Sequence, residues 1–168
     1  VQRKDWMIHV EGVEAFEKNI DDYQPFFYNR IHNNDFHQIY RDLPSDWDLI
    51  IFGDVLEHFE RDVAEDLLRW ATGASSYVLI NIPLGHDWPQ EDLYENKFER
   101  HLSEWEIDDF RDYSLVRFKT FFDFQRRPFG SFILSEKDPE NLREKLFSYD
   151  TAIKPEDEIA DDASLVNS

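Results

Sequence analysis

The stretch that most restricts the fold runs from Asp48 to Phe59 and reads DLIIFGDVLEHF. Its apolar part, residues 49–52, is typical of a strand buried inside a parallel sheet. Gly53 breaks the run, and ionisable side chains follow within a few residues: Asp54, Glu57 and His58. Ligands of open α/β sheets bind beyond the carboxyl ends of the strands. The stretch therefore predicts a cleft lined by ionisable groups at one edge of a sheet.

Hydrophobic periodicity and turn residues predict the remaining elements. Strands are expected at 6–13, in a short segment ending at 33–35, and at 48–53, 77–82, 115–124 and 129–135. Helices are expected at 14–23, 62–72, 103–112 and 142–149. Gly73 is expected to end the second helix, and Ser103, with Glu106 three residues later, to cap the third. This order predicts an α/β fold with a mostly parallel sheet covered on both faces and an antiparallel C-terminal strand pair.

Composition limits the classes of function. The 168 residues suit one domain, expected at 1–150, followed by an acidic tail at 151–168 that is expected to be disordered. The absence of cysteine excludes disulfides and thiolate metal sites. A net charge of −19 would repel phosphate backbones, so no nucleic-acid partner is expected. No apolar run approaches the ~20 residues of a membrane span, and no secretory signal opens the chain. We therefore expect a cytoplasmic protein with no membrane partner.

The order of elements and their motifs resemble a known family, the class I S-adenosylmethionine-dependent methyltransferases. DWDLIIFGDVLEHF, the helix after it and YVLINIPLG look like the fourth and fifth strands of that family. RHLSEWEIDDF and the Phe-rich strand pair look like its closing helix and last two strands. The resemblance covers about residues 6–135. It implies a Rossmann-like methyltransferase sheet.

The resemblance also implies roles in binding S-adenosylmethionine. Glu14 would hold the ribose hydroxyls, because a carboxylate accepts two hydrogen bonds from a vicinal diol. Asp35 would receive the adenine amino group, with Phe36 as a stacking face. Gly53 and Asp54 would lie beside the methionine end. Ordinary structural roles stay open for these residues: a helix-start acid, a turn aspartate and a strand-end turn.

The chain departs from the family in its glycines. It has five, at positions 12, 53, 73, 85 and 130, so the nearest two are twelve residues apart and no G-x-G loop exists. The first strand, the glycine-rich loop and the first helix are therefore expected to be missing, upstream of Val1. Cofactor binding by these residues alone is expected to be weak. The two strand edges left open are expected either to pair with another chain, as in a homodimer, or to close directly onto each other.

A metal site is a second hypothesis. Asp54, Glu57 and His58 share one side of a helix start, and His101 opens HLSEW further along. Carboxylate and imidazole ligands suit a divalent ion such as Mg, Mn, Zn or Fe. The spacing is similar to that of small-RNA 2′-O-methyltransferases, which use E-x-x-E-H and a later His before EW, although Asp54 replaces the first Glu here. The implied ligands are Glu57, His58 and His101; alternatively, LEH is a polar helix start of a metal-free enzyme.

The expected activity is methyl transfer from S-adenosylmethionine to an oxygen, or a nitrogen, of a small-molecule acceptor. His58 is the candidate general base, since its unperturbed pKa of about 6.5 suits proton removal near neutral pH. Asp54 lies beside it. A His58 that only caps or packs at the helix start is equally open. The alternative function is a non-catalytic methyltransferase-like domain used for binding or assembly.

Overall fold

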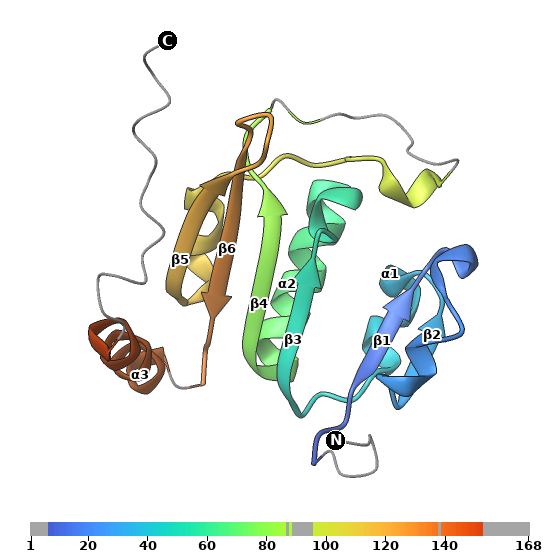
Figure 1. Ribbon diagram of the computed structural model, residues 1–168, viewed down its shortest axis with the longest axis horizontal. Coiled ribbons are helices and arrows are strands. Elements are labelled where there is room, and N and C mark those ends of the chain that lie inside the picture. The colour runs from blue at the N-terminus through green and yellow to red at the C-terminus, as the bar shows by residue number, and fades with distance from the viewer. Residues whose placement is uncertain (1–6, 87, 89–95, 138, 153–168) are drawn as a thin grey trace.

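The computed structural model describes residues 7–86, 88, 96–137 and 139–152 and has a mixed α/β fold (Figure 1). Its larger sheet has the strand order β3-β4-β6-β5. The four strands are β3 Trp47–Gly53, β4 Ser75–Pro83, β5 Leu115–Phe122 and β6 Pro128–Leu134. β3 and β4 are parallel, whereas β6 is antiparallel to both β4 and β5. The predicted α/β class and the antiparallel C-terminal pair are confirmed.

A second, two-stranded parallel sheet is formed by β1 Glu11–Glu14 and β2 Arg30–Asn33. β1 lies beside β3 in Figure 1, but no ladder within the described part of the chain joins them. The expected direct closure of these two edges is therefore wrong for these residues. Two of the four described ladders are parallel, so the prediction of a mostly parallel sheet is also wrong.

Aromatic contacts attach the small sheet to the larger one. The short helix α1, Phe36–Ile39, follows β2 directly. The Phe36 ring centroid lies 5.8 Å from that of Phe52 on β3 and 5.7 Å from that of Trp70. Edge-to-face contacts of this kind stabilise by about 0.5–1.5 kcal/mol beyond the buried area. The small sheet is thus held mainly through the helix at its end.

The core lies between the larger sheet and helix α2, Arg61–Ala74. Ala64, Leu67, Leu68 and Ala71 of α2 are fully buried, as is Ile80 of β4. The expected helix at 62–72 is confirmed, although it continues through Gly73 to Ala74, and β4 begins at the next residue. The Ser75 hydroxyl, 2.8 Å from the Ala71 carbonyl oxygen, satisfies the end of the helix. No connecting residue separates helix from strand.

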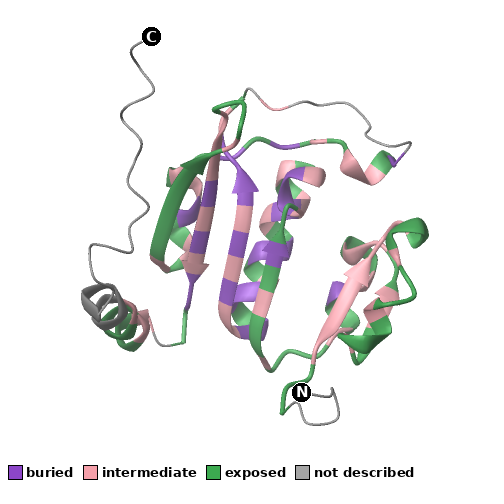
Figure 2. Cartoon of the chain, viewed as in Figure 1, coloured by how far each residue is buried: buried purple, intermediate pink, exposed green. Residues whose placement is uncertain are grey.

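The opposite face of the larger sheet is open. Leu49 and Ile51 of β3 remain 46% and 58% exposed. Figure 2 shows this strand largely green, whereas β4 is banded in purple and pink. The expectation of a sheet covered on both faces is therefore wrong for the described residues, because α2 and the segment around Phe110 pack on the same face.

Two predicted elements near the N-terminal side are wrong. The strand expected at 6–13 is only Glu11–Glu14 among the described residues. The helix expected at 14–23 is replaced by one 3₁₀ turn, η2 Glu17–Asn19, and a second, η3 Gln24–Phe26, begins directly after residue 23. Neither turn has a side-chain cap hydrogen bond or a buried residue. An α-helix there would bury too little surface to offset its ordering cost.

The helix expected at 103–112 is also wrong. A 3₁₀ helix, η7 Ile107–Tyr113, begins after Glu106, which forms a capping box with Asp109. Ser103 is not the cap, because its side chain is buried in other hydrogen bonds. The last helix, α3 Pro139–Ala152, is longer than expected. No described helix is both long enough and apolar enough to cross a bilayer.

Candidate active site

The carboxyl ends of β1, β3 and β4 point the same way, toward the top of Figure 1. Gly53 ends β3, and Asp54 follows with a φ of 53°, in the left-handed region that aspartate tolerates better than most residues. The Asp54 amide donates to the Asn81 carbonyl oxygen at 3.0 Å and so continues the β3–β4 ladder by one bond. Burial raises the pKa of the Asp54 carboxyl. The expected ionisable edge is thus present at the end of β3.

Glu57 is the most unusual group at this edge. It lies in the 3₁₀ turn η5, Leu56–His58, and is 1% exposed. Neither carboxylate oxygen has a hydrogen-bond partner among the described residues. Burial raises the pKa of the carboxyl to about 8, with the nearby charges of Asp54 and Glu99 adding to the shift. A buried carboxyl without a hydrogen-bond partner is costly, and the raised pKa keeps this one protonated below about pH 8 unless a cation binds it.

His101 reaches the same place from a distant segment. The backbone amides of Leu102 and Ser103 both donate to the Glu57 carbonyl oxygen, at 2.7 and 3.1 Å. The rings of His58 and His101 consequently lie with their centroids 5.0 Å apart. Burial, then the charges of His58 and Arg127, lower the pKa of His101 to about 4. His101 is therefore neutral at pH 7, the form that binds metal.

Hydrogen bonding orients His58. Its Nδ1 lies 3.2 Å from the Arg100 carbonyl oxygen, which can only accept. Nδ1 therefore donates to this carbonyl, and Nε2 is the ring nitrogen on the side of Glu57, 3.9 Å from a carboxyl oxygen of Glu57. A backbone carbonyl that fixes the tautomer in this way is the usual support of a metal-binding or proton-accepting histidine.

Glu57, His58 and His101 form the metal-type cluster of this site. One ligand atom from each lies within 4.8 Å of the others. The residues fit a divalent cation on three counts: a buried carboxyl with no hydrogen-bond partner among the described residues, a neutral His101, and a His58 whose Nε2 lies on the side of that carboxyl. Asp54 acts on this cluster through its charge rather than as a member of it.

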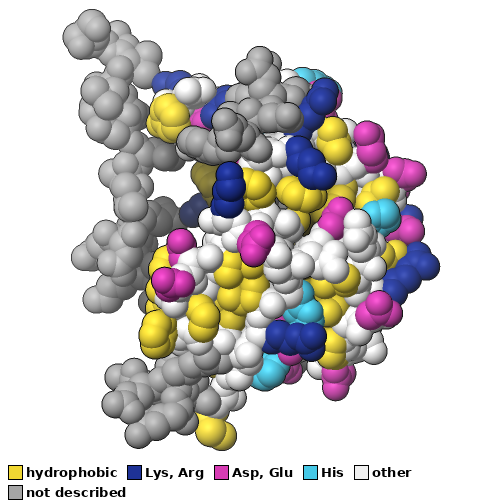
Figure 3. Space-filling view, turned by 90° about the vertical axis from the view of Figure 1, so that its right-hand side faces the viewer, with side chains coloured by type: hydrophobic (Ala, Val, Ile, Leu, Met, Phe, Trp, Pro, Cys, Tyr) yellow, Lys and Arg dark blue, Asp and Glu magenta, His cyan; other side chains and the backbone are white. Residues whose placement is uncertain are grey.

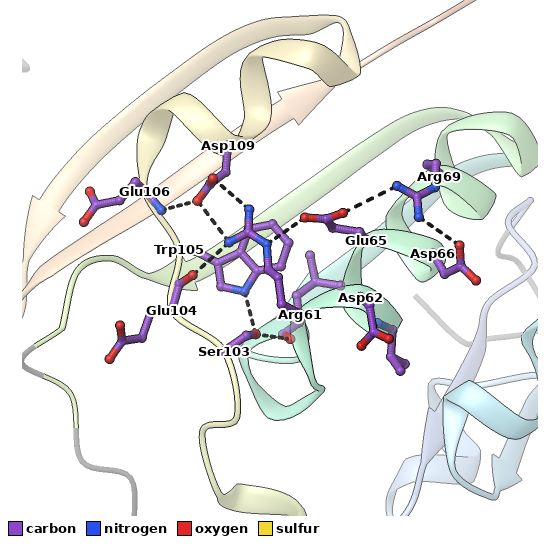
Figure 4. Close-up of polar contacts among 12 residues, drawn as sticks. Arg61, Asp62, Glu65, Asp66, Arg69, Ser103, Glu104, Trp105, Glu106 and Asp109 are labelled. Atoms are coloured by element: carbon purple, nitrogen blue, oxygen red, sulfur yellow. Dashed lines mark hydrogen bonds and ion pairs between the residues drawn. The ribbon is translucent and has the colours of Figure 1, made fainter.

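A network centred on Arg61 holds the His101 segment in place (Figure 4). The guanidinium of Arg61 stacks 3.9 Å from the ring centroid of buried Trp105 and donates to the Glu104 carbonyl oxygen at 2.9 Å. It also pairs with Asp109 at 2.7 Å. The Trp105 indole donates to Ser103 Oγ at 2.9 Å. Arg61 thus joins the start of α2 to the segment that carries His101.

Sequence reasoning missed this network and also Trp88. The Trp88 indole donates to the Leu84 carbonyl oxygen at 3.0 Å, and its ring centroid lies 6.4 Å from that of His101. The Arg127 guanidinium lies 4.1 Å from the Trp88 ring centroid. The loop that contains Trp88 has no periodicity that could have indicated these contacts. Arg61 likewise looks like any basic residue at a helix start.

The candidate cofactor residues lie at the ends of β1 and β2. Glu14 Oε1 accepts from the Phe16 amide at 2.8 Å, and Asp35 caps α1 by accepting from the His37 amide at 3.1 Å. Phe36 packs among core aromatic rings. Glu14 and Asp35 follow neighbouring parallel strands, since Glu14 pairs with Asn33. The structure therefore brings these two carboxylates to one side of the small sheet and gives each a local structural contact.

Comparison with known proteins gives a distant likeness among solved structures. No protein-family model matches the chain, and no curated protein matches it. Among solved structures, the methyltransferase domain of bacterial CtHen1 is similar at 17% sequence identity, with 76% of this chain and 77% of that chain covered and a TM-score of 0.47. Because this TM-score is below 0.5, the function is inferred from the chain's own residues.

Proposed function

We propose that this chain is part of a class I S-adenosylmethionine-dependent methyltransferase that acts on an oxygen, or less readily a nitrogen, of a small-molecule acceptor. A divalent cation bound by Glu57, His58 and His101 would hold the acceptor hydroxyl. The observation that carries this proposal is the buried Glu57 carboxylate, which has no donor among the described residues and faces two imidazoles at the carboxyl edge of the sheet. Such a group favours a cation over plain packing.

Each residue of the site has a distinct task in this proposal. Glu57 supplies the negative charge, and His101 and His58 supply neutral nitrogen ligands. The bound cation would polarise the acceptor hydroxyl. Asp54, whose pKa burial raises, would accept the hydroxyl proton when the Nε2 lone pair of His58 is engaged as a ligand. Without a cation, His58 itself would be the base.

The cofactor side is the weaker part of the site. Glu14, Asp35 with Phe36, and Gly53 are the proposed contacts to the ribose, the adenine and the methionine end. No glycine-rich loop is present in the sequence to meet the methionine carboxylate. Losing two or three hydrogen bonds to a charged group forfeits roughly 1.5–3 kcal/mol each. Since about 1.4 kcal/mol is a factor of ten, we expect millimolar or weaker cofactor affinity.

Transfer of a labelled methyl group tests the function directly. The chain would be incubated with millimolar methyl-labelled S-adenosylmethionine, Mn²⁺ and a panel of hydroxyl-bearing small molecules. We expect slow transfer that chelation of the metal abolishes. Asp54→Asn should reduce turnover but weaken Mn²⁺ binding less than His101→Gln, which removes a proposed ligand. Absence of transfer to every acceptor at saturating cofactor would overturn the proposal.

The second candidate function is a non-catalytic binding or assembly domain. The absence of any G-x-G pattern in the sequence favours it. This candidate does not require Mn²⁺ to bind the Glu57 cluster and does not exclude it, so Mn²⁺ binding does not decide between the two functions. S-adenosylhomocysteine should produce no heat in calorimetric titration, even at millimolar concentration. Micromolar binding of S-adenosylhomocysteine would eliminate this candidate.

A further inference from the structure

The β5–β6 hairpin differs in charge and composition from the rest of the chain. Residues 115–129 contain four basic residues and a single acid, in a protein with 37 acids and 18 bases. The same fifteen residues contain five phenylalanines. A basic, aromatic segment in an acidic protein is a local surface for an anionic partner.

The aromatic rings at the end of this hairpin are exposed. We define the hairpin tip as residues 119–126. Within it, Phe121, Phe122 and Phe124 are 44%, 68% and 90% exposed. Lys119 and Arg126 are exposed beside them. A group of exposed aromatic rings flanked by cations is typical of an interaction site rather than of an inert surface.

Internal contacts hold the tip in a defined shape. Asp123 Oδ1 accepts from the amides of Gln125 and Arg127 at 2.9 and 2.8 Å. The Arg127 guanidinium binds Asp123 at 2.7 Å and stacks on Trp88. Asp123, the one acid in residues 115–129, is therefore paired with Arg127 and does not neutralise the charge of Lys119 or Arg126. The tip is preorganised to present cations and aromatic rings.

The chain itself contains a segment of opposite character. Residues 153–168 include five acids, at positions 156, 157, 158, 161 and 162, and one lysine. Ile159 stands between the two acidic groups, so this segment offers an apolar side chain as well as charge. Both features complement a tip made of phenylalanines and cations.

The preceding helix places this segment within reach. α3 ends at Ala152 and packs on β5, where Arg143 donates to the Leu115 carbonyl oxygen at 2.8 Å. β5 spans eight residues, or roughly 26 Å. The ten residues from 153 to 162 extend to roughly 33 Å. They are therefore long enough to run from the base of β5 to the hairpin tip.

We propose that the acidic segment 153–162 of this chain docks on the hairpin tip, with its carboxylates on Lys119 and Arg126 and Ile159 against the exposed phenylalanines. The tip adjoins the candidate active site, because Arg127 stacks on Trp88 and Trp88 contacts His101. The docked segment would compete with any other anion for the tip.

Paramagnetic relaxation tests this contact in the full chain. The chain has no cysteine, so Ser164→Cys gives a single site for a nitroxide label. We expect the amide signals of residues 119–126 to lose most of their height in the oxidised form and to recover when the label is reduced. Salt at about 1 M, where the Debye length is about 3 Å, should restore most of the signal.

Matched variants and a mixing experiment decide the outcome. Lys119→Glu with Arg126→Glu should abolish the signal loss, whereas Arg30→Glu, an equally exposed change on β2, should leave it intact. Mixing a spin-labelled chain with an isotope-labelled, spin-free chain detects contact between molecules. Signal loss at the tip in that mixture would show a second copy as the occupant and overturn the proposal. No loss in the full chain would overturn it as well.

Discussion

The two sheets of this molecule differ in how deeply they are packed. Around α2 and β4, Leu56, Leu67, Ile80 and Trp105 have no exposed surface at all. In β1 and β2 no residue is buried. Figure 2 shows the contrast as purple bands on one side and pink or green on the other. In Figure 3, which faces the right-hand side of Figure 1, hydrophobic, acidic and basic side chains are interspersed over the surface.

The proposed metal site and the proposed cofactor contacts lie in differently packed halves of the molecule. The metal-type cluster stands on the deeply packed half, where Leu56 and Trp105 fix the turns that carry Glu57 and His101. The candidate cofactor residues Glu14 and Asp35 stand on the lightly packed half. A site is only as well positioned as the elements that support it. We therefore expect the cluster to be preorganised and the cofactor residues to depend on further contacts for their geometry.

The largest expected effect compares one apolar strand residue from each half. Ile80→Ala should destabilise the protein by about 2–5 kcal/mol, because it leaves a cavity between β4 and α2. Val13→Ala on β1 should cost less than about 1 kcal/mol, since Val13 is only partly buried. Chemical denaturation of both variants measures the difference. Equal losses would mean that the small sheet contributes as much as the main core.

The second effect concerns the pH dependence contributed by Glu57. A carboxyl whose pKa rises from 4.5 unfolded to about 8 folded is protonated in the native state, so its burial becomes destabilising as pH rises from 4.5 toward 8. At about 1.4 kcal/mol per pKa unit, the metal-free chain should lose roughly 2–4 kcal/mol over this range on account of Glu57.

Glu57→Gln should abolish this loss of stability as pH rises, and saturating Mn²⁺ should abolish it in the unsubstituted chain. Denaturation curves at pH 5 and pH 8 check both expectations. His101 has the opposite effect on stability. Its pKa is 6.5 in the unfolded chain and about 4 in the folded one, so the folded state loses stability as pH falls from 6.5 toward 4. A Glu57→Gln variant whose stability changes between pH 5 and pH 8 as much as that of the unsubstituted chain would contradict the assignment of Glu57 as a buried carboxyl.

The third effect tests the network that links the packed half to His101. Arg61→Ala should cost about 2 kcal/mol, because it removes charge-assisted hydrogen bonds and the stacking on Trp105. It should also weaken Mn²⁺ binding, although Arg61 is not in the cluster. Arg69→Ala, on the same helix but exposed, is the matched control and should leave both the denaturation midpoint and Mn²⁺ binding unchanged.

The smallest effect belongs to the lightly packed half. Glu11 bridges His32 and His9 at 2.8 and 2.9 Å, and these hydrogen bonds lower the pKa of its carboxyl. Its contribution is present above pH 4.5 and is lost as pH falls through the lowered value. Glu11→Gln should therefore cost less than about 1 kcal/mol at pH 6, and the cost should shrink as pH falls through the lowered pKa of Glu11. A larger cost in thermal denaturation would show that β1 is better anchored than its burial indicates.

The part of the site encoded in one contiguous stretch could be predicted from sequence. The apolar run before Gly53 specified β3, and the three ionisable residues after it fell at the sheet edge as expected. The position of His101 followed only from a family resemblance. It depends on two backbone hydrogen bonds to Glu57, across more than forty residues, that no side-chain pattern encodes.

The errors have a common physical cause. Periodicity was read as helix at 14–23 and 103–112, where the chain forms the 3₁₀ segments η2 and η7. In the second segment the buried Ser103–Trp105 pair holds the chain before Ile107 out of a helix, and in the first no residue of η2 is buried that could stabilise one. Local propensity is a weak guide where packing decides.

Because α2 ends at Ala74 and β4 begins at Ser75, the number of residues in α2 determines which side chains of β4 face the core. Side chains alternate between faces along a strand, so one residue added at this junction would turn Val78 and Ile80 outward and bring Tyr77 and Leu79 into the core. A loop would absorb such an insertion, as the turn after Asp123 would. We therefore expect a single-residue insertion or deletion at this junction to destabilise the fold, because it would change which side chains of β4 face the core.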